Sequence, residues 1–405
     1  RIVKEKHFLI SDPKSIAHIF RHDTARYYRG KYHELLKPVF GDGLLTANGE
    51  SWRQPRRLIE SHFSRQYTAN WLDIIINTTE ARIAAWRKEV SPFSLDMTQA
   101  MSGLIQEINT KILFGRTLSY RAHPVLLNAV NIINSTLLRQ VKQAMLLDGL
   151  LNRLPLPSTR RFRKAVARLH QTVDDLITHT HAHAGDDEAL YVVLCRATEQ
   201  SACPFQLRDQ LITLFLAGHE TTAVALAWIF YYLTKHPEWL DLLYNEIVDV
   251  LGDRSPTIMD LERLDHTRRV VDESLRLRPP IYGIGRRARV EDTVGGYRIP
   301  VESPVVVSPY VMHHHPAYWD CPDRFDPNRF LPERAAARPP FTYFPFGGGP
   351  HVCIGRHLAI KELLAIVALV VRAFRMMPPL GRRVVPQPAI TLRPHPGMPV
   401  RIAPR

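Results

Sequence analysis

The longest apolar stretch of the chain covers residues 205–236 and has few polar interruptions. As a single helix it would be roughly 48 Å long, at about 1.5 Å per residue, which is enough to cross a whole domain. Pro237 follows directly and ends the helix that this pattern predicts. A second apolar run, residues 356–369, is also typical of a buried helix. We therefore expect a long central helix inside one large core.

Shorter segments with helical or alternating patterns surround these two runs. Further helices are expected over residues 13–22, 49–58, 160–177, 239–251 and 266–278, and residues 65–150 have a helical texture with weak breaks. Strands are expected over residues 1–10, 284–290, 294–299, 304–308, 390–392 and 399–402, with irregular chain over 24–50 and 313–342. No linker or repeat divides the sequence. We predict a mainly α fold with a minor β part, in which residues 1–405 form a single domain.

A polar group interrupts the central apolar stretch. Residues 217–222 read Ala-Gly-His-Glu-Thr-Thr, in the middle of the expected long helix. Gly218 opens space, and a hydroxyl in mid-helix can bond back to the backbone and distort the ladder. This pattern indicates a binding site at Glu220 and Thr221. A kink that only accommodates packing is the alternative.

A glycine-rich loop with one cysteine precedes the second apolar helix. Gly347, Gly348 and Gly349 permit backbone conformations closed to other residues, and prolines flank them. Cys353 then stands at the expected helix N-terminus, where unpaired N–H groups lower a thiol pKa. A thiolate here could be a nucleophile, a redox thiol or a metal ligand. A buried structural cysteine is the plainer alternative.

Two pairs of side chains share a helix face. Trp52 and Arg56 are four residues apart, so an aromatic ring and a cation lie on one side, which suits a flat, acidic cofactor. A surface arginine stacked on a tryptophan explains the same spacing. Glu273 and Arg276 are three residues apart and can form an ion pair, which on its own is an ordinary surface feature.

Composition limits the remaining possibilities. The net charge of +14 and the isoelectric point of about 9.8 fit a nucleic acid, an anionic membrane or an acidic protein partner. No nucleic-acid recognition motif is present. The four cysteines, Cys195, Cys203, Cys321 and Cys353, form no zinc or disulfide pattern, which favours a reducing compartment. We expect a cytoplasmic location. The chain begins at Arg1, so a membrane anchor that was trimmed from its N-terminus is the alternative.

Taken together and in this order, the motifs resemble the cytochrome P450 superfamily of haem-thiolate monooxygenases, over the whole chain. Residues 346–355 match the haem loop Phe-x-x-Gly-x-(Arg/His)-x-Cys-x-Gly, and residues 217–221 match the oxygen-activation motif (Ala/Gly)-Gly-x-(Asp/Glu)-Thr. Residues 273–276 match Glu-x-x-Arg, and residues 327–330 match the Pro-x-Arg-Phe segment. One departure is Pro55 beside Arg56, which is tolerable in a first helical turn.

The resemblance implies a single prism-shaped, mainly α fold with haem b between the long central helix and the helix after Cys353. Cys353 would be the iron ligand. The residues that would contact the cofactor are Trp52, Arg56, Ala217, Arg287, Phe346, His351, Cys353 and Gly355. Glu273, Arg276 and Arg329 would form a buried structural network. Arg56, Arg287 and His351 would contact the two haem propionates, and Arg287 is assigned to this role because it lies five residues before Asp292.

The resemblance also implies a reaction and its partners. Thr221 would hold dioxygen and Glu220 would relay protons, for oxidation of a lipophilic substrate such as a terpenoid, fatty acid or polyketide. Thr213, Leu216, Ala217, Gly283 and Ile284 would line the substrate pocket. The chain contains no reductase-like segment, so electrons from NAD(P)H would arrive through a separate ferredoxin, flavodoxin or diflavin reductase. We expect such a partner at a basic surface of a monomer, formed by Arg53, Arg57, Arg356 and Lys361.

Two other functions are compatible with the same haem loop. One is a haem-thiolate peroxygenase or isomerase that does not use dioxygen, and the other is a non-catalytic haem-binding sensor. Neither has an evident use for Glu220 and Thr221, so the sequence favours the monooxygenase.

Overall fold

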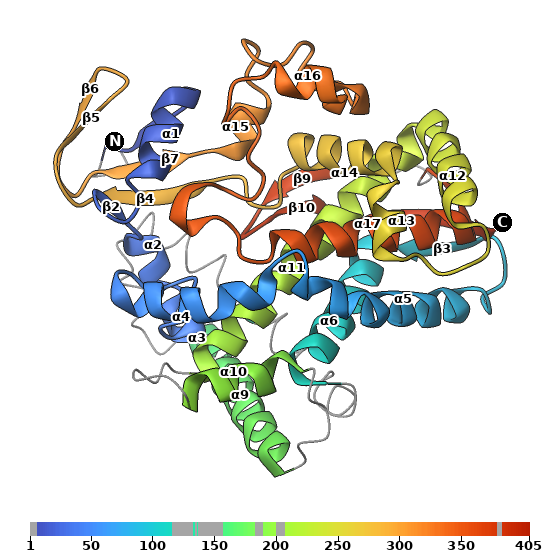
Figure 1. Cartoon of the computed structure of the whole chain (residues 1–405), viewed down its shortest axis with the longest axis horizontal. Coiled ribbons are helices and arrows are strands. Elements are labelled where there is room, and N and C mark those ends of the chain that lie inside the picture. The colour runs from blue at the N-terminus through green and yellow to red at the C-terminus, as the bar shows by residue number, and fades with distance from the viewer. Residues whose placement is uncertain are drawn as a thin grey trace.

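The computed structural model describes residues 6–115, 133, 136, 157–182, 189–199, 207–378 and 383–405. Most of the helical texture expected between residues 116 and 150 lies outside this set, as does Cys203. The architecture is mainly helical, with short strands gathered into small sheets (Figure 1).

The central helix predicted from the apolar stretch is α11, which covers Leu207–Lys235. It contacts α6 (Met97–Phe114), α14 (Asp265–Leu277) and α17 (Arg356–Ala373), and most of its side chains are buried. Within the described part of the chain, α11 is long and apolar enough to cross a membrane, yet most of its apolar window is buried inside the protein. It is therefore the core helix of this fold, as the pattern predicted.

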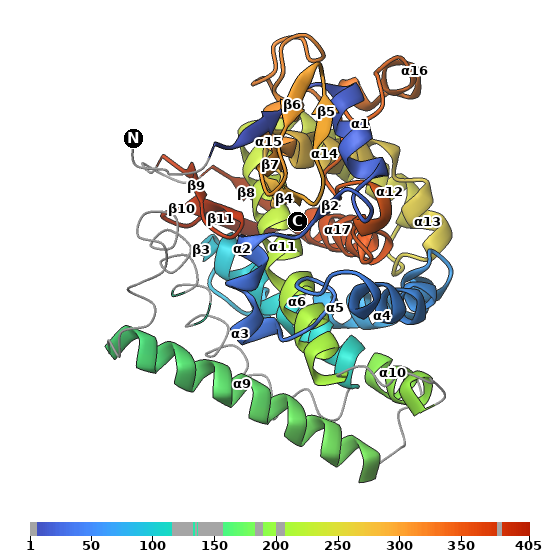
Figure 2. The same ribbon diagram turned by 90° about the vertical axis from the view of Figure 1, so that its left-hand side faces the viewer.

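The remaining helices surround this core. They are α1 (Pro13–Arg21), α2 (Lys31–Glu34), α3 (Lys37–Phe40), α4 (Glu50–Glu60), α5 (Leu72–Trp86), α9 (Pro157–Ala182), α10 (Leu190–Glu199), α12 (Pro237–Leu251), α13 (Ile258–Glu262), α15 (Pro309–His313) and α16 (Pro332–Ala336). Figure 2 shows α9 lying along one side of the molecule, below α3 and α6. The expected helix over 160–177 is thus longer than predicted at both ends.

Local chemistry explains where these helices start. Asp12 caps α1 by accepting a hydrogen bond from the backbone N–H of Ser15 at 2.8 Å, and Pro13 follows at the first helical position. In α4, Pro55 lies in the second turn, so the expectation that it falls in the first turn is wrong. Its missing N–H removes one hydrogen bond of that helix.

Within the described residues, the strands form four small sheets. The largest has the order β1-β7-β4-β2, with β1 (Phe8–Ile10) parallel to β7 (Pro304–Val307) and β4 (Ile284–Ala288) between β7 and β2 (Tyr27–Tyr28). The others pair β3 (Phe93–Asp96), β11 (Pro399–Pro404) and β8 (Phe374–Met377), then β9 (Val385–Pro388) with β10 (Leu392–His395), and β5 (Asp292–Val294) with β6 (Tyr297–Ile299).

Two expectations about these segments are wrong in detail. The strand expected over 390–392 is the bend before β10, which begins at Leu392. Residues 24–50, expected to be irregular, contain β2, α2 and α3. Each of these elements is at most four residues long, too short to show a period in the sequence.

Candidate active site

The loop around Cys353 is held by its own backbone and by α1. The N–H of Cys353 donates to the carbonyl of Phe346 at 2.9 Å. Gly347 and Gly349 have positive φ angles of 74° and 65°, as a glycine-rich loop permits. A Cβ on Gly349 would lie 2.1 Å from the backbone oxygen of Phe20. The close approach that the glycines allow is therefore to α1, and not only to a ligand.

Cys353 is an exposed residue of this loop, although protein atoms surround its thiol. It precedes α17 by three residues, and surrounding protein raises its pKa through burial, against the opposing effects of the Gly355 backbone N–H and the guanidinium of Arg56. The expectation that the helix start alone lowers this pKa is wrong. A bound metal cation would reverse the balance, because coordination deprotonates a thiol.

Among the described residues, no three His, Cys, Asp or Glu side chains are grouped as metal ligands. A metal at Cys353 would therefore take its other ligands from a cofactor. This distinguishes the site from a zinc centre, in which protein side chains supply three or four ligands.

One side of α11 is accessible at the position of its polar group. Ala217 is exposed and Thr221 is half-buried, although most of the helix around them is buried. The hydroxyl of Thr221 donates to the carbonyl of Ala217 at 2.7 Å, the back-bond expected of a hydroxyl in mid-helix. An exposed alanine in a core helix indicates a space beside it that a ligand can use.

Trp52, Arg56 and His351 come together beside the cysteine loop. The rings of Trp52 and His351 have centroids 4.0 Å apart. Nη1 of Arg56 donates to the carbonyl of Val352 at 3.0 Å. Nε of Arg56 and Nε2 of His351 are both buried and have no hydrogen-bond partner in the protein. Two orphaned polar atoms on one surface are the pattern left by a polar ligand.

Arg287 lies apart from this group. Its Nη1 is 3.6 Å from the carboxylate of Glu302, on the opposite face of β4 from its neighbour Arg286. Arg286 is buried, and its Nη2 donates to Asp23 at 2.7 Å. The same carboxylate lies 2.8 Å from Nδ1 of His351. The structure thus brings Arg286, and not Arg287, into the group around His351.

Besides Arg286, sequence reasoning missed three more members of this group. Asp23 is fully buried, and its contacts with His351 and Arg286 hold its pKa below the usual range despite its burial. Arg29 lies with its guanidinium 6.0 Å from the Trp52 ring, and burial beside Arg286 and Arg56 lowers its pKa to about 9. Burial also lowers the pKa of His33 to about 3. Arg29 and His33 fall in the segment expected to be irregular, and Asp23 lies between that segment and the helix expected over 13–22, so no spacing marked any of them.

Glu220 is held by residues far away in the sequence. Its Oε1 accepts from the hydroxyl of Thr391 at 2.6 Å, and from Nε and Nη2 of Arg393 at 2.7 and 2.6 Å. Both partners belong to the segment that leads into β10 or to β10 itself. The polar pair of α11 is therefore split, since Thr221 bonds within the helix and Glu220 bonds across to a hairpin.

Comparison with known proteins identifies this arrangement. The family model described as Cytochrome P450 matches residues 1–399. The chain belongs to the cytochrome P450 family. The P450 is 34% identical over 376 residues to cyclooctatin synthase of Streptomyces melanosporofaciens, covering 91% of this chain and 81% of that protein. It is 31% identical over 385 residues to cyclooctat-9-en-7-ol 5-monooxygenase of the same organism, covering 94% and 82%.

Solved structures agree with this assignment. The heme domain of cytochrome P450DA matches the fold with a TM-score of 0.87 at 25% sequence identity, covering 98% of this chain and 87% of that one. The expected mainly α P450 fold is confirmed. P450 monooxygenases are oxidoreductases that use haem and depend on a redox partner.

The residues present fit a haem. Among the described residues, the buried charged groups around Trp52 are three arginines, Arg29, Arg56 and Arg286, and one carboxylate, Asp23, and Arg56 also forms an ion pair with the exposed Glu60 at 3.0 Å. Positive groups therefore outnumber negative ones at this surface, which suits the propionates of a haem. Excess buried charge is costly without a counter-ion, and the lowered pKa of Arg29 reflects that cost.

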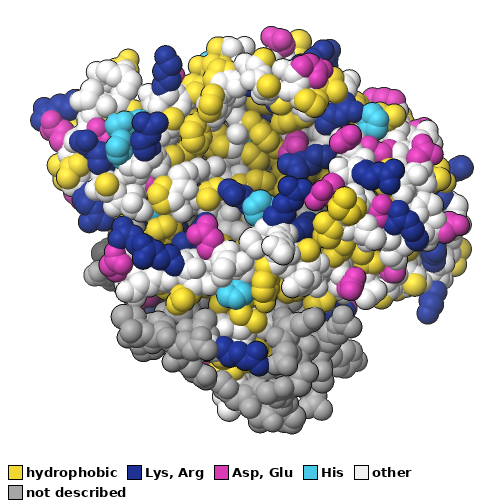
Figure 3. Space-filling view, viewed as in Figure 1, with side chains coloured by type: hydrophobic (Ala, Val, Ile, Leu, Met, Phe, Trp, Pro, Cys, Tyr) yellow, Lys and Arg dark blue, Asp and Glu magenta, His cyan; other side chains and the backbone are white. Residues whose placement is uncertain are grey.

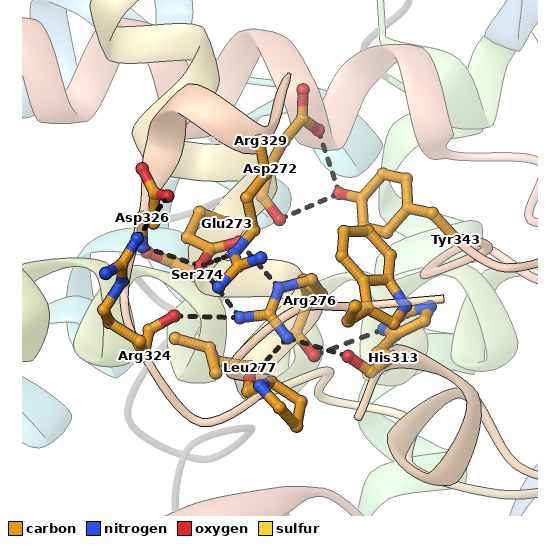
Figure 4. Close-up of polar contacts among 12 residues, drawn as sticks. Asp272, Glu273, Ser274, Arg276, Leu277, His313, Arg324, Asp326, Arg329 and Tyr343 are labelled. Atoms are coloured by element: carbon orange, nitrogen blue, oxygen red, sulfur yellow. Dashed lines mark hydrogen bonds and ion pairs between the residues drawn. The ribbon is translucent and has the colours of Figure 1, made fainter. Parts of the chain in front are cut away.

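Figure 4 shows the group of polar contacts around Glu273, which includes Arg276, Arg329 and His313. Glu273 and Arg276 are fully buried, with Nε of Arg276 donating to Glu273 at 2.7 Å, and Nε of Arg329 lies 3.5 Å from the same carboxylate. Nη1 of Arg276 donates to the carbonyl of His313 at 2.7 Å, while the His313 ring lies 3.0 Å from the backbone N–H of Phe344. The network therefore reaches the segment that enters the cysteine loop.

The residues expected to line the substrate pocket divide into two sets. Ala217 and Gly283 are exposed and Ile284 is half-buried, with its Cδ1 3.5 Å from the Cβ that Gly347 would carry. Thr213 and Leu216 are buried instead. Thr213 faces Gly43, where an added Cβ would lie 2.0 Å from its hydroxyl, so that position packs against a loop.

The structure also revises the expected basic surface. Arg57 and Arg356 are exposed, and Arg53 forms an ion pair with Glu50. Lys361 is buried, and its ammonium donates to Thr68 at 2.7 Å. Its inclusion in an exposed patch is wrong. On the face drawn in Figure 3, basic and acidic side chains are interspersed, and the surface is hollowed near the centre between apolar side chains.

Proposed function

We propose that this P450 inserts one oxygen atom from dioxygen into a terpenoid hydrocarbon or alcohol. Two electrons and two protons reduce the second oxygen atom to water, so substrate R–H, dioxygen, electrons and protons give R–OH and water. The observation that carries this proposal is the opening in α11, where Ala217 is exposed and Thr221 is accessible within a buried helix. The substrate class rests on relatives such as pentalenene oxygenase of Streptomyces avermitilis, which is 29% identical over 367 residues, covering 90% of this chain and 80% of that protein.

Cys353 would hold haem b through its thiolate, and the cofactor would supply the oxidising chemistry. Arg29, Arg56, Arg286 and His351 would bind the propionates, with the forked arginines giving charge-assisted bonds. Trp52, Phe346 and Gly355 would pack beside the macrocycle. In this proposal, Arg286 takes the role that the sequence assigned to Arg287.

The protein would then control water and protons. Thr221 presents its hydroxyl at the accessible side of α11, where it would turn from the Ala217 carbonyl toward the pocket and hold a proton there. Glu220 would exchange protons with water as a general acid–base group. Ala217, Gly283 and Ile284 would give the pocket an apolar wall that excludes water and accommodates a lipophilic substrate.

We place the enzyme in the cytoplasm as a monomeric domain over residues 1–405, supplied with electrons from NAD(P)H through a separate ferredoxin or flavodoxin with its reductase, or through a diflavin reductase. Cys321 and Cys353, which form no disulfide in the described part of the chain, support a reducing compartment. Arg57 and Arg356 would contribute to the docking surface for an acidic donor.

Labelled dioxygen tests the reaction. The purified enzyme, with a surrogate ferredoxin and reductase, is incubated with a panel of cyclic terpene hydrocarbons and alcohols under isotopically labelled dioxygen. We expect a product that carries one labelled oxygen atom. A product with oxygen from water or added peroxide only, or turnover confined to linear fatty acids, would contradict the reaction or the substrate class respectively.

A further inference from the structure

The carboxylate of Glu220 is bound unequally at its two oxygens. All three donors, the Thr391 hydroxyl and two nitrogens of Arg393, contact Oε1 at 2.6 to 2.7 Å. Among the described residues, no donor contacts Oε2. One oxygen is thus fixed by a cation, whereas the other is free to exchange hydrogen bonds with water.

The hairpin that supplies Arg393 also touches the pocket. Nε1 of Trp228 in α11 donates to the carbonyl of Leu392 at 2.7 Å, and the N–H of Leu392 donates to Pro280 at 3.0 Å. The hydroxyl of Tyr282 donates to Ala389 at 2.7 Å. The segment of residues 280–282 leads directly to Gly283 and Ile284, two of the accessible residues proposed to meet the substrate. These hydrogen bonds link one wall of the pocket to the partners of Glu220.

We propose that Arg393, with Thr391, is a positioning residue that holds Glu220 by one oxygen and couples occupation of the pocket to proton delivery through the β9–β10 hairpin. This inference rests on the proton-relay role proposed for Glu220. Arg393 is partly exposed, with 37% of its side chain accessible, whereas the Glu220 side chain is 11% accessible, so the pair connects the interior to solvent.

The chemistry of the pair follows from its charges. The Arg393 guanidinium forms charge-assisted contacts with one oxygen of the Glu220 carboxylate and holds it in place. When the hairpin shifts, Glu220 is free to turn, takes a proton from solvent at Oε2 and passes it toward Thr221 through water. It returns to the carboxylate, so each cycle transfers one proton and leaves Glu220 unchanged.

Substitution of Arg393 by Met or Lys tests this coupling in the haem-loaded protein. The charge-deleting variant Arg393→Met should lower the product formed per electron pair by about three- to tenfold, within the range for coupled neighbouring residues. Arg393→Lys retains a cation and should recover part of that loss. Arg401→Met, at a half-buried position of β11, is the matched control and should leave coupling unchanged.

A second measurement does not depend on turnover. Infrared difference spectra between each protein and its Glu220→Gln counterpart isolate the carboxylate stretching bands of Glu220, whose frequencies depend on how its two oxygens are bound. Arg393→Met should shift these bands, because Oε1 then loses the guanidinium that contacts it. Binding of a spin-shifting substrate to wild type should shift them in the same direction, because the hairpin then releases Glu220, and unchanged bands in both cases would overturn the inference.

The outcomes separate the inference from the role of Glu220 itself. If Glu220→Gln alone leaves coupling unchanged, the relay role fails. If Glu220→Gln uncouples the enzyme but Arg393→Met does not, or if Arg393→Met causes the same loss again in the Glu220→Gln background, the positioning role of Arg393 is overturned. An Arg393→Met effect that disappears in that background supports it.

Discussion

The carboxylate of Asp23 lies 2.8 Å from Nδ1 of His351, which joins the end of α1 to the loop that carries Cys353. Both side chains are buried, and burial is the main reason that the pKa of His351 falls to about 4. At neutral pH the imidazole is therefore uncharged, and the positive excess of the site comes from its arginines. The contact fixes which ring nitrogen faces Asp23 and leaves Nε2 for a ligand.

Adjacent arginines of β4 provide a matched pair of variants. Arg286→Met should weaken haem retention by about tenfold or more, because it removes a buried forked cation and leaves Asp23 without it. Arg287→Met should have little effect, since its guanidinium faces Glu302. Haem transfer to an excess of an apoprotein acceptor measures both rates. Faster haem loss in Arg287→Met than in Arg286→Met would restore the original assignment.

Removal of the Thr221 hydroxyl should separate binding from productive turnover. Thr221→Ala keeps the accessible turn of α11 and should leave haem content and the substrate-induced spin shift unchanged. It should divert electrons to peroxide, because the hydroxyl no longer steers protons at the opening. Glu220→Gln should slow product formation, toward the ~10²-fold loss typical of a missing acid–base group. Product, peroxide and consumed cofactor are measured together, and unchanged ratios in both variants contradict this role.

A buried carboxyl on α17 should make stability depend on pH. Burial raises the pKa of Glu362 from 4.5 to about 8, against the effect of a hydrogen bond from Thr222. The folded state then binds the proton more tightly than the unfolded state. The contribution of Glu362 to the free energy of unfolding therefore falls as pH rises from about 5 to 8. The loss is of the order of a few kcal/mol at the upper end.

The Glu362→Gln variant isolates that contribution. It stays neutral at every pH, so its melting temperature should rise relative to wild type between pH 5 and pH 8, the window set by the two pKa values. Glu333→Gln, at an exposed position of α16, is the control and should show no such trend. A difference between Glu362→Gln and wild type that does not change with pH would contradict the raised pKa.

Exposed cations near the cysteine loop should steer the electron donor. Charge reversal in Arg356→Glu should slow association with an acidic ferredoxin several-fold, without altering substrate affinity. Exposed charges are screened over about 8–10 Å at physiological ionic strength, so the difference should shrink as salt is added. Stopped-flow reduction at varied salt measures this effect. Salt-independent kinetics, or the same rate in Arg356→Glu as in wild type, would assign the basic surface to another purpose.

Long apolar stretches and turn residues were the features of this fold that the sequence could predict. The length of the apolar stretches placed α11 and α17, and the glycines Gly295 and Gly296 placed the turn between β5 and β6. The partners of Glu220 could not be predicted, because Thr391 is 171 residues away and local patterns carry no information on such pairs. Asp23 and Arg29 were missed for the same reason.

The choice between Arg286 and Arg287 shows a second limit. Adjacent residues of a strand face opposite sides, so an error of one position in the register exchanges the buried and the outer side chain. The sequence contains both arginines in a row and does not say which one faces inward. The structure answers this question, because Arg286 is buried and donates a hydrogen bond to Asp23.

The spectrum of the reduced protein with carbon monoxide tests the central claim most directly, because it reports haem and thiolate ligation together. The wild-type protein should show the red-shifted Soret band of a thiolate-ligated haem, and Cys321→Ser, at an exposed free cysteine, should keep it. Cys353→Ser should lose that band. A wild-type protein without it, or a Cys353→Ser variant that retains it, would contradict the assignment of Cys353 as the haem ligand.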